Sequence, residues 1–150
     1  MNYKILLLIV MLLLSLNVKS QKHTPLTYIN KYDSLSLSLT TESKIPTSII
    51  LGISMLESGY GTSKLSINKH NFFGVKKGKY YGKYENDTAS FRDFCYYISK
   101  RKYYDFLTKN NITDYKIWLK NIRKGGYSAS RNWSTKVLYY IKKYKLYQYD

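Results

Sequence analysis

Hydrophobic positions from residue 28 onward repeat at intervals of three and four, which predicts a mostly helical chain. Such spacing places apolar side chains on one face of a helix, where they pack into a core. Short polar stretches separate the periodic segments. We therefore expect helices over residues 28–41, 46–58, 63–68 as a single turn, 87–98 with a continuation over 103–107 after a bend, 113–122 and 133–144.

The first of these segments is ambiguous, because Leu35, Leu37 and Leu39 alternate with serines as they would in a strand. Tyr28 and Tyr32, together with two of the leucines, keep the helical spacing, so a helix is preferred.

Residues suited to helix ends flank the later segments. Pro46 suits the first turn of the helix over 46–58. Asp87 or Thr88 can cap the helix over 87–98, and Thr113 can cap the helix over 113–122. Glycines stop two helices, at Gly59 with Gly61 and at Gly125-Gly126.

The segment from Phe72 to Glu85 differs, since three glycines are interleaved with aromatic residues. This pattern favours a small β-hairpin. The fold class expected is α+β, mostly α, in one domain with no internal repeat. The single cysteine, Cys95, cannot form an intramolecular disulfide, so the domain is held together by its core.

The N-terminus has the pattern of a targeting segment. Lys4 precedes an apolar run, and Val18 and Ser20 supply small residues at the cleavage positions. We expect a signal peptide over 1–20, a short mature leader over 21–27 and a catalytic domain over 28–150, with no transmembrane span after cleavage. The alternative is an uncleaved N-terminal anchor.

The chain is strongly basic. Taking Lys4 and Lys19 from the 25 basic residues leaves 23 against 9 acidic ones, a net charge of +14 after cleavage. Such a field concentrates polyanions, and anionic cell-envelope polymers are candidate partners for an exported protein. Solubility alone also explains the charge.

One carboxylate is placed where a proton donor can work. Glu57 ends an apolar helical run, just before Gly59 and Gly61. Neighbouring apolar side chains and the negative end of the helix dipole both raise the pKa of such a carboxyl group toward that of a general acid. An exposed helix-terminal glutamate is the simpler interpretation.

Other chemistries lack their motifs. No cluster of metal-ligand spacing, no Gly-x-Ser-x-Gly elbow and no phosphate-binding glycine loop occurs, so we expect neither a metal nor a cofactor. A nucleophilic Cys95 paired with His70 is conceivable, but a small buried hydrophobe is the preferred interpretation of Cys95.

The residues resemble the glucosaminidases of glycoside hydrolase family 73, which are exported peptidoglycan hydrolases with a lysozyme-like fold. The resemblance covers Tyr28 to Asp150. It rests on Ile45-Pro46, on the ordered motifs Leu56-Glu57-Ser58-Gly59-Tyr60-Gly61-Thr62-Ser63 and Asn71-Phe72-Phe73-Gly74-Val75-Lys76, and on Ser90-Phe91-Arg92-Asp93, Asp114-Tyr115-Lys116 with Trp118, and Gly126-Tyr127-Ser128.

The resemblance implies an endo-β-N-acetylglucosaminidase that cleaves peptidoglycan glycan strands, with Glu57 as general acid. Substrate-binding positions implied by the motifs are Ser58, Tyr60, Asn71, Phe73 and Tyr127. A capping Asn, a core Phe and a packed Tyr are the structural alternatives for the last three.

The second carboxylate departs from the family pattern. Between Phe73 and Ser90 the chain is short and basic, and only Glu85 and Asp87 are acidic. Either is a possible base for water, although Asp87 also suits a helix cap. A substrate-assisted route, in which the N-acetyl group attacks the anomeric carbon, needs no second protein carboxylate.

Two other functions stay open. A muramidase or a lytic transglycosylase of lysozyme-like fold shares a helix-terminal Glu. A non-catalytic protein that binds cell wall or nucleic acid also uses basic residues interleaved with aromatic ones, as in Lys100-Arg101-Lys102-Tyr103-Tyr104. The glycosidase motifs argue against specific nucleic-acid binding.

Overall fold

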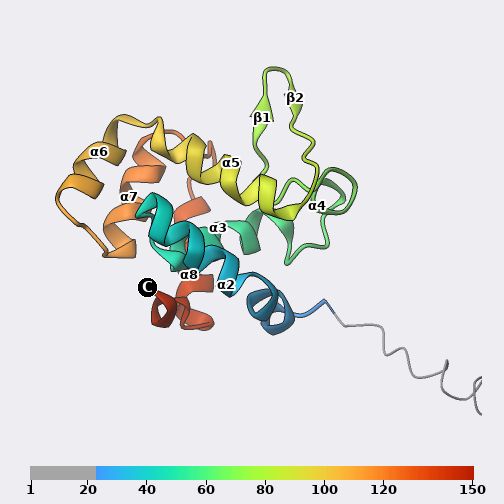
Figure 1. The fold of residues 1–150 in the computed structure, drawn as a ribbon, viewed down its shortest axis with the longest axis horizontal. Coiled ribbons are helices and arrows are strands. Elements are labelled where there is room, and N and C mark those ends of the chain that lie inside the picture. Colours follow the sequence, from blue (N-terminus) through green and yellow to red (C-terminus); the bar gives the residue numbers. More distant parts are fainter. Residues whose placement is uncertain (1–22) are drawn as a thin grey trace, which may run out of the picture.

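The computed structural model describes residues 23–150, so the expected signal peptide over 1–20 and its cleavage point lie outside the described residues. Figure 1 shows a helical body with one projecting hairpin. Helix α2 begins at Pro25, within the stretch 21–27 that was expected to be a leader. The elements in chain order are α2 (Pro25–Ser43), α3 (Thr47–Ser58), α4 (Lys64–Lys69), β1 (Lys76–Lys77), β2 (Tyr80–Tyr81), α5 (Asp87–Ser99), α6 (Lys102–Lys109), α7 (Tyr115–Lys124), α8 (Trp133–Lys143) and the 3₁₀ turn η1 (Leu146–Tyr149).

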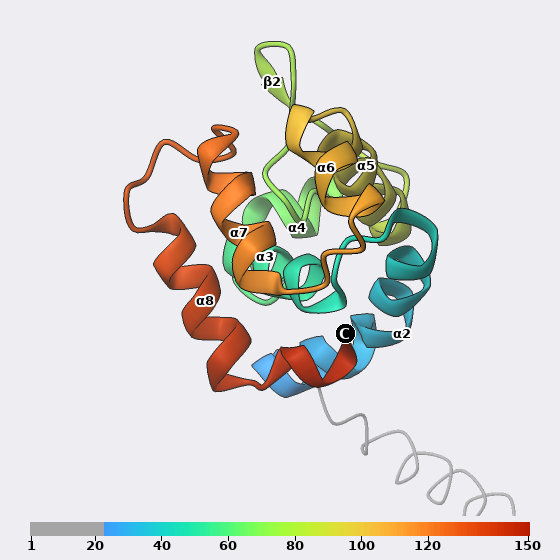
Figure 2. The ribbon, with the colours of Figure 1, turned by 90° about the vertical axis from the view of Figure 1, so that its left-hand side faces the viewer.

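Helix α3 is the centre of the fold. It lies in the middle of the helical body with α2, α5, α7 and α8 around it (Figure 2), and every residue from Thr47 to Met55 is buried. A helix that is apolar all round must be covered on all sides. Gly52 allows α8 to approach closely, because a Cβ at this position would lie 2.8 Å from Cγ1 of Ile141.

The helix predicted over 28–41 is confirmed as α2, and the apolar stripes of the later helices form the core. The predicted caps are partly wrong. Asn86, not Asp87 or Thr88, caps α5 by accepting from the backbone N–H of Ala89 at 2.9 Å. Asp114, not Thr113, caps α7. Each capping residue lies one position from a predicted one, because neighbouring polar residues compete for the N-cap position.

The start of α3 is capped from the far end of the chain. Pro46 is the N-cap residue rather than part of the first turn, and its side chain makes no hydrogen bond. The Asp150 carboxylate accepts from the backbone N–H and the hydroxyl of Ser48, both at 2.7 Å. A carboxylate at this helix end is also favoured by the helix dipole.

The small hairpin expected between Phe72 and Glu85 is confirmed. Strands β1 and β2 pair antiparallel, with Lys76 opposite Tyr81, and both strands are exposed. Figure 1 shows the hairpin extending beyond the helices. Within residues 23–150, none of the helices combines the length and apolar character that crossing a membrane requires.

Candidate active site

Glu57 lies in the last turn of α3, where the chain turns sharply away from the core. Gly59 (φ +56°) closes the helix in a left-handed conformation, and its N–H donates to the carbonyl of Met55. Tyr60 is also left-handed (φ +58°), which costs energy for a residue with a bulky side chain. The turn leaves the Glu57 side chain half-buried at the end of the most buried helix.

Trp133, on α8, holds the Glu57 carboxylate through a hydrogen bond. Its indole N–H donates to Oε1 of Glu57 at 2.7 Å, across 76 residues of sequence. Trp133 is the first residue of α8 and is buried. Its ring lies against that of Tyr127, with 5.0 Å between centroids. The hydrogen bond fixes one carboxylate oxygen and leaves the other for a reacting group.

Burial raises the pKa of the Glu57 carboxyl above its ordinary value, and the hydrogen bond from Trp133 offsets part of that rise. Desolvation penalises the charged form, whereas a donor to the carboxylate favours it. The net pKa is raised, as expected from the apolar sequence around Glu57. A carboxyl group with a raised pKa keeps its proton closer to neutral pH, which general acid catalysis requires.

A cavity of about 350 Å³ opens beside this carboxyl group. Gly74 lies beside the carboxylate with φ +63°, and a Cβ there would be 3.6 Å from Oε2 of Glu57. Glu57 is the single acidic residue among those that line the cavity. The lining residues are Glu57, Phe73, Gly74, Val75, Lys76, Tyr97, Tyr127 and Ser128.

Tyr127 and Phe73 form one wall of the cavity and brace each other. The Tyr127 hydroxyl donates to the backbone carbonyl of Phe73 at 2.9 Å. The Phe73 ring is buried and stacks on Phe94, with centroids 4.1 Å apart and planes within 8°. Burial raises the pKa of the Tyr127 hydroxyl well above its usual range, so the hydroxyl stays protonated and acts as a donor.

Asn71 and Ser58 lie beside the site but are buried and do not line the cavity. The Asn71 amide nitrogen donates to the carbonyls of Val75 and Gly82, both at 2.9 Å, and its oxygen accepts from the N–H of Val75. Ser58 donates to the carbonyl of Ser54 and accepts from the N–H of Gly61. Both side chains therefore hold backbone in place, Asn71 at the base of the hairpin and Ser58 in the turn after Glu57.

Tyr60 faces a different cavity, of about 560 Å³, which it lines together with Tyr28, His70 and Asp87. Its ring packs edge-on against Tyr140, with 5.6 Å between centroids. The structure thus brings Phe73 and Tyr127 to Glu57 but places Tyr60 outside the Glu57 cavity.

Neither candidate for the second carboxylate lines the Glu57 cavity. Glu85 is exposed. Asp87 accepts from the hydroxyl of Tyr32 at 2.6 Å and pairs with His70 at 2.7 Å and Lys31 at 3.0 Å. Burial raises the pKa of Asp87, but these three hydrogen bonds outweigh it and the net pKa is lowered.

The alternative nucleophile pair is not assembled. His70 bonds Asp87, whereas Cys95 is buried against a separate cavity that Ser43 and Tyr104 help to line. Burial raises the pKa of the Cys95 thiol to about 12, so it stays protonated at neutral pH. Among residues 23–150, no group of three or more His, Cys, Asp and Glu residues is arranged to hold a metal ion.

Trp133 was not among the candidate site residues, because in the helix expected over 133–144 it belongs to the apolar stripe with Val137 and Ile141, a pattern that predicts a core position. The signal that points to the site is chemical: a buried indole N–H needs an acceptor, and Glu57 has no local donor.

The helical fold with one small hairpin, and a cavity in which Glu57 is the one acidic lining residue, are compatible with a glycoside hydrolase. The catalytic domain of the autolysin Auto from Listeria monocytogenes has a similar structure, with a TM-score of 0.73 and 20% identity over 91% of this chain and 93% of that one. An N-acetylmuramoyl-L-alanine amidase from Staphylococcus aureus matches with a TM-score of 0.73 and 21% identity, over 87% of this chain and 44% of that chain.

A sequence model of the glucosaminidase family, described as mannosyl-glycoprotein endo-beta-N-acetylglucosaminidase, matches residues 33–146. The chain belongs to this glucosaminidase family and is a glycoside hydrolase. The match covers most of the stretch from Tyr28 to Asp150 that carries the motifs of the glucosaminidase family. No curated protein matches the chain.

Proposed function

We propose that the protein is an exported endo-β-N-acetylglucosaminidase that hydrolyses the glycan strands of peptidoglycan, with Glu57 as the general acid. The observation that carries the proposal is the Glu57 carboxyl group, held by Trp133 and facing the cavity with a raised pKa. Family membership and the similarity to an autolysin catalytic domain support peptidoglycan as the substrate. Export rests on the targeting pattern of residues 1–20.

In the proposed mechanism, protonated Glu57 donates its proton to the glycosidic oxygen as the bond to the anomeric carbon breaks. Trp133 holds Oε1, which leaves Oε2, beside Gly74, to face the leaving oxygen. Tyr127, held by its hydrogen bond to the Phe73 carbonyl, gives the sugar a rigid aromatic wall, and aromatic rings suit the apolar faces of sugar rings. Proton donation by a positioned acid contributes about 10²- to 10⁴-fold to a rate.

The products identify the bond that is cleaved. Mass spectrometry of digested peptidoglycan should show reducing-end N-acetylglucosamine for the wild type. Reducing N-acetylmuramic acid would indicate a muramidase instead. A 1,6-anhydro end would indicate a lytic transglycosylase, a candidate favoured by the presence of only one cavity-lining carboxylate.

Because Glu57 is the one carboxylate that lines its cavity, we also propose the substrate-assisted route, in which the N-acetyl group of the substrate is the nucleophile. This route predicts that neither Glu85 nor Asp87 is required as a base. We expect Glu85→Gln combined with Asp87→Asn to keep kcat within about threefold of wild type, because neither side chain lines the cavity. The measurement is the rate of peptidoglycan solubilisation at a temperature where circular dichroism shows the variant folded.

The Asp87→Asn single variant is the control, since Asp87 also bonds Tyr32 and His70 and its loss lowers stability. Complete loss of activity in the folded double variant would contradict the substrate-assisted route and assign one of the two carboxylates as the base.

The hydrogen bond from Trp133 predicts a shift in pH dependence. This bond lowers the pKa of Glu57, so Trp133→Phe should raise it further. A general acid must be protonated, and activity falls as pH rises through its pKa. We therefore expect the alkaline limb of the profile of kcat/KM against pH to move to higher pH.

Trp118→Phe is the matched control for this variant. The indole N–H of Trp118 also donates at 2.7 Å, but to the carbonyl of Ile112, and Trp118 does not line the Glu57 cavity. Its alkaline limb should coincide with that of the wild type. An unmoved limb in Trp133→Phe, or one displaced to lower pH, would show that Glu57 does not set it.

A further inference from the structure

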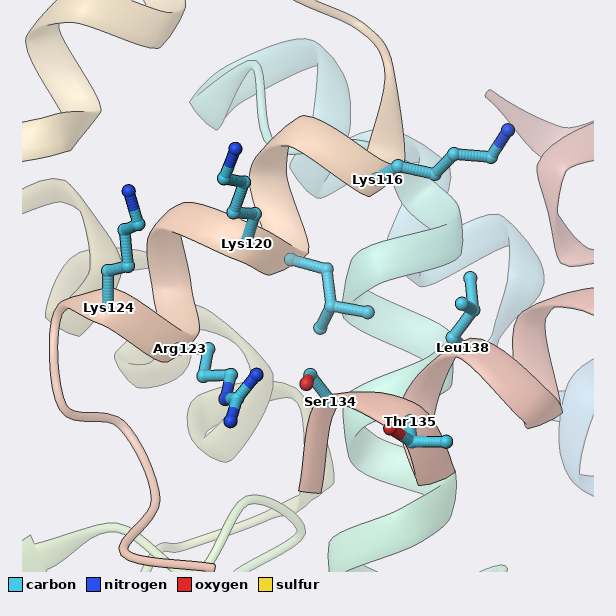
Figure 3. Close-up of a pocket in the computed structure, with 8 residues that line it drawn as sticks. Lys116, Lys120, Arg123, Lys124, Ser134, Thr135 and Leu138 are labelled. Carbon is cyan, nitrogen blue, oxygen red and sulfur yellow. The ribbon is translucent and has the colours of Figure 1, made fainter. Parts of the chain in front are cut away.

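A second cavity, of about 430 Å³, forms a groove between α7 and α8 and shares no residue with the Glu57 cavity. In Figure 3, the side chains of Lys116, Lys120 and Lys124 project from α7 on the side away from α8, and Ser134, Thr135 and Leu138 lie on α8. The Arg123 side chain extends toward Ser134. We call this the α7–α8 groove; its lining residues are Lys116, Leu119, Lys120, Arg123, Lys124, Ser134, Thr135 and Leu138.

The cations of the groove are free of ion-pair partners. Lys116, Lys120, Arg123 and Lys124 are exposed, and none takes part in the ion pairs found within residues 23–150. No acidic residue lines the groove. The four positions lie within nine residues of one helix, which extend about 12 Å along its axis at a rise of 1.5 Å per residue. The groove therefore has a row of positive charge along its outer α7 edge, with Arg123 extending toward α8, rather than a single anion site.

The rest of the lining is aliphatic and hydroxylic. Leu119 is buried and Leu138 is half-buried, with Ser134 and Thr135 beside them on α8. No aromatic side chain lines the groove, so bases of a nucleic acid would find no ring to stack on. The surface is also hollowed, which suits a chain lying along it better than the flat surface of a bilayer.

We propose that the α7–α8 groove binds a linear phosphodiester polymer of sugar or polyol units carried by the cell wall. Several phosphates in sequence would meet the row of cations, and the C–H groups of the linking units would pack on Leu119 and Leu138. Binding there would retain the enzyme near its glycan substrate. Only the assignment of the polymer to the wall rests on the proposed function.

The test measures binding of purified poly(glycerol phosphate) by calorimetry, with wild type and Lys120→Gln/Lys124→Gln. We expect the double variant to bind at least about tenfold more weakly at ~50 mM salt and its salt slope to be smaller by about 1.4, because each lost cation–phosphate contact lowers that slope by roughly 0.7. The control, Lys102→Gln/Lys142→Gln, removes the same charge from exposed positions outside the groove. Lys142 matches Lys124 in lying in the last turn of its helix. It should change affinity by less than about twofold.

Equal losses in both variants would overturn the proposal, because net charge alone would then explain the binding. Equal or tighter binding of an oligothymidine with the same number of phosphates, lost in the same variant, would assign the groove to nucleic acid. Binding of phosphatidylglycerol vesicles but not of the polymer would assign it to membrane. Since the assay involves no hydrolysis, its failure is distinct from a failure of the glucosaminidase assignment.

Discussion

Glu57→Gln should lower the rate of peptidoglycan hydrolysis by about a thousandfold, in the middle of the range for general acid catalysis. The amide keeps an oxygen that can accept from Trp133, so the geometry of the site is retained while the transferable proton is lost. The measurement is clearing of a peptidoglycan gel, with mass spectrometry of the products. Binding to insoluble wall should equal that of the wild type.

The stability of this variant gives an independent check. The folded-state pKa of Glu57 is raised, so this group favours the folded state at low pH and disfavours it as pH rises through that pKa. At neutral pH the neutral amide removes the unfavourable buried charge, and the Tm of Glu57→Gln should not fall below that of the wild type. Clearing equal to the wild type would refute the assignment of Glu57 as general acid.

Asn71→Ala should destabilise the protein by about 3 kcal/mol, because it leaves buried backbone groups without partners. Asn71 is 1% exposed and makes three hydrogen bonds to the backbone at the base of the hairpin, two with Val75 and one with Gly82. Thermal unfolding should show Tm lowered by about 10 °C. Because Val75 and Lys76 line the Glu57 cavity, kcat/KM should fall as well.

The control is Asn121→Ala, which removes an exposed amide that bonds the carbonyl of Ile117 within its own helix. Its cost should stay within about 0.5 kcal/mol. A Tm for Asn71→Ala equal to that of the control would mean that the hairpin does not depend on this amide.

Local patterns predicted the helices well, because apolar spacing reports which face is buried. The residues that cap helices were less predictable: Asn86 and Asp114 each stand beside the residue expected in that role. Adjacent polar side chains have similar capping energies, and the turn geometry selects among them.

A candidate site could be proposed from the sequence only where its chemistry is local. Glu57 could be found from its apolar helix end, but its partner Trp133 comes from a helix 76 residues away and carries no local signal. Asp87 shows the same limit, since its bonds to Tyr32 and Lys31 join α5 to α2, elements far apart in sequence. The tethering role of Asn71 likewise depends on the closure of the hairpin.

The close approach of Ile141 to Gly52 joins the two helices that carry Glu57 and its hydrogen-bond donor Trp133. Gly52 lies about 7.5 Å along α3 from Glu57, and Ile141 about 12 Å along α8 from Trp133, at 1.5 Å per residue. A methyl group added at Gly52 would lie too close to the Ile141 side chain, so we expect Gly52→Ala to shift α8 relative to α3 and to weaken the bond between indole and carboxylate. The alkaline limb of the pH profile should then move to higher pH, in the same direction as for Trp133→Phe.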